Sequence, residues 1–371
     1  MGQMLKPLMD VTRDDLQVEL NSYTPGAGLA WAQLFPLRYT PKFDLKGIQG
    51  DEGIPVSADR VAFNTRASKK TRKTIGSWSG QLGKIAVSRS KNELEINEYN
   101  DLKTISAANV DDVATANYLV DMVYDDVKFC ATGMDYRVEV DALRIGSSGK
   151  QVLTQEVDGD MATNDEINFN IPTKNFGGVT AKWDNAETAD GLNDIAVAQK
   201  KITKAGLKKP MWAFMSQEAF DYLCAQKATL KRVASAALNV TDLATSDSVS
   251  LESINAYQRK HQRPQIIIID SYVTIEKKNG EQETIQPWNV NVCVLSPEPR
   301  LGYTYYKTVP SVEATEAIQS YGAYYKVTRY SDVNPMEETT LAEAYVQPAL
   351  TNRASLAFIN TMNTAWNDGA V

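Results

Sequence analysis

The 371-residue sequence contains one histidine, three cysteines and no hydrophobic run near 18 residues. The missing run excludes a membrane-spanning helix, and residues 1–15 lack the apolar core of a signal peptide. The cysteines (Cys130, Cys224 and Cys293) lie far apart, without the spacing of metal ligands. They therefore predict buried, reduced thiols in a cytosol-like compartment, and no structural metal site.

Motifs of catalysis or ligand binding are poorly matched. His261 lies in RKHQR, and no G-x-S-x-G accompanies it to form a triad. GSSGK at 146–150 has two residues between its glycines where a phosphate-binding loop has four, and this favours a turn. Residues 158–166 resemble a calcium loop but place Ala162 and Thr163 where Asp or Asn and Gly are required. We therefore expect no catalytic, cofactor or metal site, and we expect that the protein is not an enzyme.

A basic stretch at 60–91 stands out in a chain with a net charge of −7. It has nine basic residues and no acidic one, so the remainder sums to −16 (−7 minus +9). Val61 and Phe63, and Ile85 and Val87, alternate as in strands, around a glycine-rich tip that carries Trp78. We interpret the stretch as a two-stranded arm that contacts an acidic neighbouring copy. The expected contact residues are Arg60, Arg66, Lys69, Lys70, Arg72, Lys73, Trp78, Lys84, Arg89 and Lys91.

Two features suggest nucleic-acid binding, but each has a better explanation. The basic stretch has little aromatic interleaving, and the acidic total argues against a general nucleic-acid binder. Seven of the seventeen tyrosines lie between Tyr303 and Tyr330, with few basic neighbours. Bases stack on such residues, yet a core or a subunit interface is the preferred interpretation.

The remaining pattern predicts mixed helix and strand, and hence an α+β fold. Residues 1–56 show one short helix (Thr12–Leu20) and otherwise indicate an arm or linker rather than a core unit. A long helix at about 110–145, ending near Gly146, is predicted to pack on a sheet rather than form a coiled coil. Its apolar stripe is Val113, Ala116, Val120, Val123, Val127, Cys130, Met134 and Val138.

Residues 186–330 alternate helices with hydrophobic strands, which predicts a compact α/β layer. Gln265–Ile269 is the most hydrophobic of these strands, and Asn279–Gly280 marks a hairpin over 272–285. Residues 167–171 and 179–183 also alternate like strands, and β character returns in the last forty residues.

The order of these parts resembles the HK97-type major capsid protein of tailed double-stranded DNA bacteriophages, in particular the lambda-like major head proteins. The resemblance is carried by LFP at 34–36, GIP at 53–55, the basic arm, the 110–145 helix and MWAFMS at 211–216. It implies an N-terminal arm (1–56), an extended β-hairpin loop or E-loop (57–100), a peripheral P-domain with the long spine helix (101–185 and 331–371) and an axial A-domain (186–330).

The resemblance also implies partners and a location. Copies would assemble as pentamers and hexamers of an icosahedral phage head, which encloses double-stranded DNA without sequence-specific binding. A separate scaffolding protein, a portal and a decoration protein are implied partners, with assembly in the bacterial cytoplasm and the virion as final location. No membrane, cofactor or lysine–asparagine crosslink is expected. An encapsulin-type compartment and a two-domain α+β enzyme or binding protein are the alternatives.

Overall fold

The computed structural model describes residues 5–45, 79–108, 113–153, 166–238, 249–277, 279–312 and 316–366. The helices are α1 (Arg13–Ser22), α2 (Trp31–Leu34), α3 (Glu93–Ala108), α4 (Val113–Ser148), α6 (Gly191–Lys204), α7 (Gln217–Ala225), α8 (Lys227–Leu238) and α9 (Leu251–Lys260), with 3-10 turns at Thr173–Asn175 and Arg353–Ser355. The strands are β1 (Leu37–Tyr39), β2 (Gly83–Asn92), β3 (Lys150–Val152), β4 (Glu166–Asn168), β5 (Phe176–Gly178), β6 (Trp212–Ser216), β7 (Gln265–Ile269), β8 (Val273–Glu276), β9 (Gln282–Ile285), β10 (Val292–Ser296), β11 (Gly302–Lys307), β12 (Ile318–Tyr321), β13 (Lys326–Val333), β14 (Met336–Leu350) and β15 (Ala357–Asn360).

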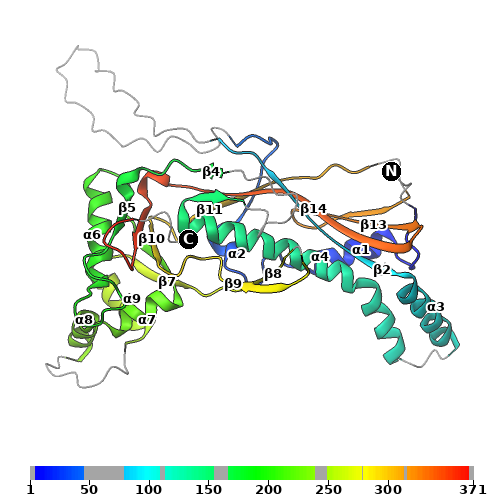
Figure 1. Ribbon diagram of the computed structural model, residues 1–371, viewed down its shortest axis with the longest axis horizontal. Helices are drawn as coiled ribbons and strands as arrows, with labels where there is room; N and C mark the ends of the chain where they lie inside the picture. The colour runs from blue at the N-terminus through cyan, green and yellow to red at the C-terminus, as the bar shows by residue number, and fades with distance from the viewer. Residues whose placement is uncertain are drawn as a thin grey trace, which may run out of the picture.

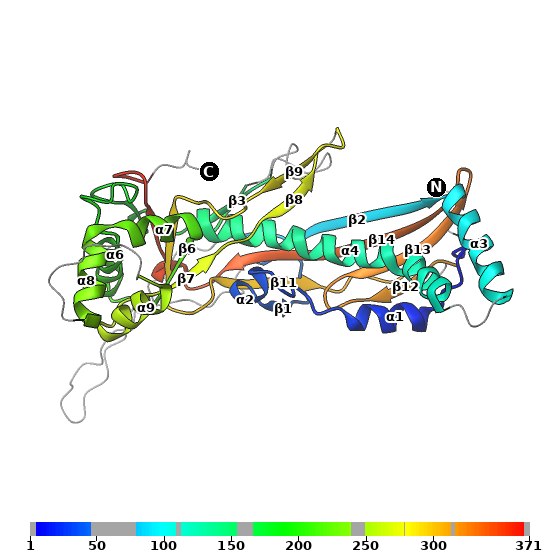
Figure 2. The same cartoon turned by 90° about the horizontal axis from the view of Figure 1, so that it is seen from below.

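These elements form an elongated molecule with two units (Figures 1 and 2). The long unit contains the six-stranded sheet β1-β11-β14-β13-β12, with β2 paired to β14, together with α1 to α4. The compact unit contains the five-stranded sheet β5-β15-β10-β6-β7 and the helices α6 to α9. An α+β architecture with a long helix on a sheet is therefore confirmed.

Strand β14 organises the long unit. One of its edges pairs antiparallel with β2 over ten residues, from Glu337 opposite Asn92 to Val346 opposite Gly83. Its other edge pairs first with β13 and then with β11. A single 15-residue strand thus joins segments that are far apart in the sequence.

Helix α4 packs on β14 and β2, as predicted (Figure 2). The expected stripe is buried from Val123 onward, but Val113, Ala116 and Val120 are exposed. These residues lie in the first turns of α4, which project with α3 at the far end of the long unit (Figure 1). The end predicted at Gly146 is also wrong, because α4 continues to Ser148 and Gly149 follows with φ +75°. A Cβ on Gly146 would lie 3.0 Å from Trp288, so Gly146 is needed for close packing and not to stop the helix.

The N-terminal segment is part of the core, which corrects the prediction of an arm or linker. Helix α1 forms as predicted, and Thr12 caps it. Leu16, Trp31 and Phe35 are fully buried in the main core. Strand β1 extends the sheet by pairing parallel to β11. The hydrophobic periodicity of the sequence did not indicate this packing, because the segment contributes single buried side chains separated by turns.

Buried carboxylates fix the same segment through its main chain. Glu338 accepts hydrogen bonds from the N–H groups of Leu8 and Met9, both at 2.8 Å. On α4, Glu139 accepts from Trp31 N–H at 2.7 Å, and it also accepts from Ala30 N–H at 3.1 Å and the Ser271 hydroxyl at 2.5 Å. Asp135, one turn earlier, accepts from Gly26 N–H at 2.8 Å. Burial raises the pKa of the Asp135 carboxyl, against the opposing effect of this hydrogen bond and one from Tyr324.

The compact unit does not coincide with the predicted range 186–330. Strands β11, β12 and β13 begin within that range but belong to the six-stranded sheet, whereas β5 and β15 lie outside it and belong to the five-stranded sheet. The five-stranded sheet is buried on both faces: Phe214 packs in the main core, while Ala213 and Met215 pack under the helices. Double burial explains why its strands are continuously hydrophobic.

Other local predictions had mixed outcomes. The β8–β9 hairpin forms with Gly280 at φ +80°, as expected from Asn279–Gly280. The strand predicted at 167–171 is β4, at Glu166–Asn168, but 179–183 is irregular and the neighbouring strand is β5. Tyr305, Tyr324 and Tyr325 are buried in the core, as predicted, and the other four tyrosines of 303–330 are partly buried.

Candidate assembly surface

Three of the predicted contact residues lie on β2, which is held in the sheet by β14 rather than projecting freely. Because side chains alternate along a strand, Arg89 and Lys91 lie on the α4 side of the sheet, while Lys84 lies on the other. All three form ion pairs within the chain. Their predicted contact with a neighbouring copy stays a prediction, as do those of Arg60, Arg66, Lys69, Lys70, Arg72, Lys73 and Trp78, which lie outside the described residues.

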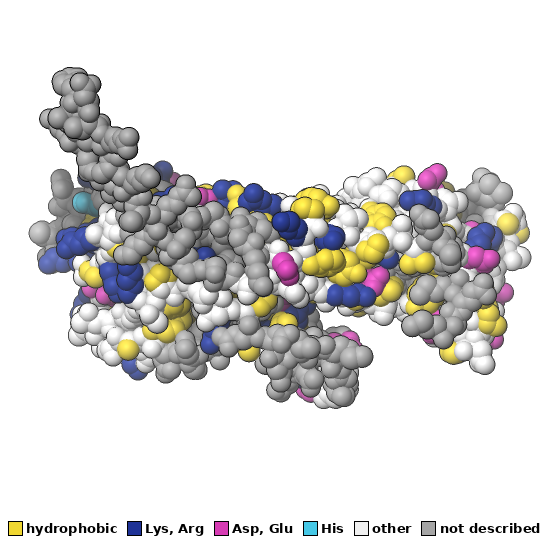
Figure 3. Space-filling view, turned by 90° about the horizontal axis from the view of Figure 1, so that it is seen from above, with side chains coloured by type: hydrophobic (Ala, Val, Ile, Leu, Met, Phe, Trp, Pro, Cys, Tyr) yellow, Lys and Arg dark blue, Asp and Glu magenta, His cyan; other side chains and the backbone are white. Residues whose placement is uncertain are grey.

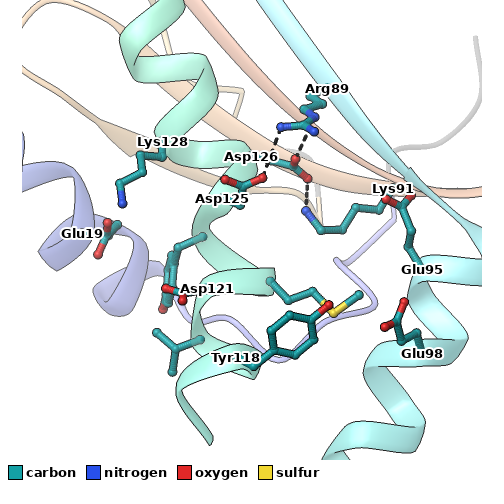
Figure 4. A pocket seen from close by; sticks show the side chains of 13 residues that line it. Glu19, Arg89, Lys91, Glu95, Glu98, Tyr118, Asp121, Asp125, Asp126 and Lys128 are labelled. Carbon is teal, nitrogen blue, oxygen red and sulfur yellow. Dashed lines mark hydrogen bonds and ion pairs between the residues drawn. The ribbon is translucent and has the colours of Figure 1, made fainter. Parts of the chain in front are cut away.

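Arg89 and Lys91 meet two adjacent carboxylates of α4 (Figure 4). Arg89 lies 3.2 Å from Asp125 and 3.4 Å from Asp126, and Lys91 is paired with Asp126. Lys91 and Asp126 are only 5% and 3% exposed. Removing one member of a buried pair leaves the other charge desolvated and unpaired, so this network fixes β2 against α4.

Lys84 forms a more exposed pair on the opposite face of the sheet. Its ammonium lies 2.5 Å from Glu343, which is also 3.5 Å from Lys326. Burial alone would raise the pKa of Glu343. The hydrogen bond from Lys84 and the positive charges of Lys84 and Lys326 outweigh burial, so this pKa lies below its usual value.

An acidic groove of about 570 Å³ opens beside the Asp125–Asp126 network, bounded by α1, β2, α3 and α4 (Figure 4). Six carboxylates line it, against three basic side chains. Since Arg89 and Lys91 are occupied by Asp125 and Asp126, Glu98 and Asp121 are left with no ion-pair partner among the described residues. The six carboxylates are Glu19, Glu95, Glu98, Asp121, Asp125 and Asp126.

The groove also exposes apolar side chains. Tyr118 and Val120, on the first turns of α4, line the groove and are 51% and 56% exposed. Free carboxylates beside exposed apolar side chains suit a partner that is basic and partly apolar. This surface was not predicted, because no helix was expected at the position of α3. Residues 93–100 of α3 fall in the predicted E-loop. The signal that a helix assignment would have used is the three-residue spacing of Ile96 and Tyr99, the buried apolar side chains of α3.

The motifs examined for chemistry form no site in the described part of the chain. Exposed His261 caps the C-terminus of α9 and packs 4.4 Å from the Tyr257 ring. Residues 146–150 run from the end of α4 into β3, while most of the calcium-like loop lies outside the description. Cys130 and Cys293 are buried and Cys224 is partly buried, all as free thiols. Burial raises the pKa of Cys130 to about 11, which makes it unreactive.

Across the ranges that the structure describes, His, Cys, Asp and Glu side chains form no group of three or more that could hold a metal ion. Among the same residues, no helix is both long and apolar enough to cross a membrane.

The fold is similar to that of solved phage proteins. A protein assigned as the capsid protein of a prophage in Escherichia coli CFT073 aligns with a TM-score of 0.55 and 14% identity, over 95% of this chain and 99% of that one. A phage-related protein from Bordetella bronchiseptica RB50 aligns with a TM-score of 0.50 and 12% identity, over 97% and 98%.

The SrpI encapsulin of Synechococcus elongatus also aligns, at 10% identity over 98% and 93% of the two chains. Its TM-score of 0.38 is too low to bear on function. No family model and no curated protein sequence matches this chain. The chain therefore has the HK97-type fold expected from the order of its elements.

Proposed function

We propose that this chain is the major capsid protein of a tailed double-stranded DNA phage. Copies would assemble as pentamers and hexamers of an icosahedral head that encloses the genome. The observation that carries the proposal is the likeness of the whole fold to the E. coli prophage capsid protein. The chain would be structural rather than catalytic, assembled in the bacterial cytoplasm and retained in the virion.

The two units suit the roles implied by this fold. The long unit, with α4 and the six-stranded sheet, would be the peripheral domain. The compact unit would be the axial domain around the five- and six-fold axes. Residues 1–56 would be the N-terminal arm, of which 5–45 pack on their own subunit, and 57–100 would include the E-loop. A scaffolding protein, a portal and a decoration protein are further proposed partners.

The acidic groove supports the proposed contact between copies. The predicted arm carries Lys69, Lys70, Arg72 and Lys73 with no acidic residue among them. Glu98 and Asp121 offer unpaired carboxylates on the long unit. We propose that the arm of one copy lies near this groove on the next, where complementary charge would set the register of the contact and speed association.

Electron microscopy of the purified protein tests the proposal directly, and closed icosahedral shells are the expected result. Reversing the arm (Lys69→Glu, Lys70→Glu, Arg72→Glu, Lys73→Glu) should prevent or derange shell closure while circular dichroism stays unchanged. Reversing the groove (Glu98→Lys, Asp121→Lys) should do the same, and combining both sets should restore shells. The matched control, Asp184→Lys with Asp270→Lys, changes exposed carboxylates of the compact unit and should assemble normally.

Each outcome identifies which part of the proposal fails. Closed shells of normal size from the reversed arm would refute the arm as the steering element. A soluble monomer or dimer under all assembly conditions would refute the capsid function itself. Small closed particles that carry an enzyme cargo and no DNA would instead establish the encapsulin alternative.

A further inference from the structure

The compact unit carries a dense group of basic residues in two stretches of sequence. Residues 199–209 and 259–263 contain eight lysines and arginines and no acidic residue, in a chain whose net charge is −7. We name this surface the basic edge. Its residues are Lys200, Lys201, Lys204, Lys208, Lys209, Arg259, Lys260 and Arg263.

The topology brings both stretches to one edge of the five-stranded sheet. The first leads from α6 into β6 and the second from α9 into β7, and these parallel strands start side by side, Trp212 opposite Gln265. The Gln199 side chain ties the two together, because its Nε2 donates to the carbonyls of Pro210 at 2.7 Å and Gln262 at 3.2 Å. Figure 3 shows Lys and Arg side chains at the end of the molecule that the compact unit occupies.

Most of these charges are exposed and unused within the chain. Lys200, Lys201, Lys204, Arg259 and Lys260 are exposed, and none has an ion-pair partner among the residues that the structure describes. The long unit differs, since its basic residues on β2 are all paired. An array of unpaired like charges on one surface costs stability through repulsion, and this suggests that a polyanion binds there.

A nearby carboxylate does not neutralise the basic edge. Glu298 is hydrogen-bonded by Arg300 at 2.8 Å and by Asn352 at 3.1 Å, and Lys208 also donates to Asn352 at 3.0 Å. Glu298 is therefore balanced by Arg300, which is not counted in the basic edge. The positive charge of Lys208 also lowers the pKa of Glu298, so seven positive charges of the basic edge remain in excess.

Helix stabilisation explains only part of the basic edge. Cations in the last turn interact favourably with the helix dipole, and this accounts for Lys201 and Lys204 in α6 and for Arg259 and Lys260 in α9. It does not account for the basic residues that follow the helices. Among these, Arg263 has a buried Nη1 with no hydrogen-bond partner.

A protein partner is also disfavoured, because lysine is depleted in protein interfaces, where aromatic residues are enriched. Lysine on a flexible stem, by contrast, suits a phosphate backbone.

We propose that the basic edge binds the phosphate backbone of double-stranded DNA without reading its sequence. This rests on the proposed function, in which the shell encloses such DNA. Each phosphate neutralised by a lysine or arginine releases a condensed counterion, so the affinity should fall steeply with salt. A single basic surface on a chain with a net charge of −7 is consistent with the expectation that the chain is not a general nucleic-acid binder.

The test measures binding of full-length subunit to a short fluorescent DNA duplex by anisotropy, between about 50 and 200 mM salt. The variant Lys200→Gln, Lys204→Gln, Arg259→Gln, Lys260→Gln removes four exposed charges. Its slope of log affinity against log salt should be shallower by about 3 to 4, at about 0.9 per phosphate contact. The matched control removes four exposed lysines elsewhere (Lys6→Gln, Lys42→Gln, Lys174→Gln, Lys182→Gln) and should bind like the unchanged protein.

An unchanged slope in the basic-edge variant, or an equal loss in the control, would overturn the proposal. So would defective self-association with unchanged DNA binding, because the edge would then face an acidic surface of a second copy. Two duplexes of unrelated sequence should bind equally, and a strong preference would contradict backbone recognition. Shells are scored separately by microscopy: normal shells with no edge-dependent DNA binding refute this inference alone, and edge-dependent binding without shells refutes only the capsid function.

Discussion

The long unit and the compact unit use charge in opposite ways. In the long unit, Arg329 is buried and paired with Glu338, Lys91 is buried and paired with Asp126, and Glu139 accepts three hydrogen bonds. In the compact unit, lysines and arginines crowd one exposed edge without ion-pair partners among the described residues. Burial distinguishes the two cases: a buried charge must be satisfied within the chain, whereas an exposed one remains available to a partner.

The comparison also explains why a basic residue does not by itself mark a contact. Arg89 and the edge residue Arg259 carry the same charge, but Arg89 is engaged by Asp125 and by the ring of Phe129, 4.9 Å from its guanidinium. Removing buried, paired charges in the long unit should therefore change stability, and removing charges from the basic edge should change binding. The following experiments test this division.

The largest expected loss of stability comes from the buried pair in the long unit. Replacing Glu338 by Gln leaves Arg329 unpaired and weakens the acceptor for Leu8 and Met9 N–H. We expect the free energy of unfolding to fall by about 3–5 kcal/mol, measured by urea denaturation of the subunit. Glu337→Gln, its neighbour on the strand, should change it by less than about 0.5 kcal/mol.

The double variant Arg329→Met, Glu338→Leu refines this prediction. It removes both charges but leaves the main-chain donors of the N-terminal segment without an acceptor, so we expect only partial recovery of stability. Full recovery would mean that Glu338 acts on Arg329 alone and does not hold that segment.

A smaller loss is expected at Glu139, which has no ion pair but accepts three hydrogen bonds. An amide at this position presents one oxygen and one N–H₂ group, so at least one donor among Ala30, Trp31 and Ser271 loses its acceptor. Glu139→Gln should lower the free energy of unfolding by about 1–3 kcal/mol. Asp121→Asn, exposed on the same helix, should be nearly neutral in the same assay.

The partly exposed pair of Glu343 and Lys84 should matter less and depend on pH. Because the pKa of Glu343 is lowered in the folded chain, its contribution is present above the unfolded pKa of about 4.3 and is lost as pH falls through the folded value. Lys84→Gln, which leaves Glu343 paired with Lys326, should therefore cost at most about 1 kcal/mol at pH 7. Urea midpoints from pH 7 to 3 should show the difference from the unchanged protein shrinking toward acid, and a difference that grows there would contradict the assignment.

The smallest effect on stability is expected at the basic edge. Lys200→Gln removes an exposed charge with no partner in the described structure, so the free energy of unfolding should change by less than about 0.5 kcal/mol. A loss comparable to that of Glu139→Gln would show that the edge is structurally engaged, and the contrast between the units would disappear.

Much of the fold follows from sequence because its main elements have strong periodicity. Helix α4, the strands β6 and β7, and the β8–β9 hairpin each carry a local signal in spacing or turn residues. The N-terminal packing had no such signal, since Trp31 and Phe35 are anchors whose partners lie on α4 and later strands. The first turns of α4 were predicted to be buried because their apolar side chains have the same three-to-four-residue spacing as the rest of the helix. This spacing does not show where the sheet that covers the helix ends.

The candidate surfaces were only partly predictable. The charge of 60–91 was visible, but pairing of Arg89 and Lys91 with Asp125 and Asp126 depends on β2 lying across α4, a long-range contact. The basic edge was divided between two stretches about fifty residues apart, and only the parallel pairing of β6 and β7 brings them together. The sequence shows which residues are basic. Whether a basic side chain is free to bind a partner depends on its burial and on its contacts within the chain, and these are known only from the structure.

Strand β14 has a consequence for synthesis. Glu337, which pairs with Asn92, leaves the ribosome 245 residues later (337 minus 92). At translation rates of about 5–20 residues per second, β2 waits roughly 12–50 s for its partner, and the apolar face of α4 waits somewhat less. An incomplete chain therefore exposes an open strand edge and an uncovered hydrophobic helix, which nascent-chain chaperones must shield. The elongation rate over 93–336 thus sets how long every new subunit is at risk of aggregating before it can enter an assembly.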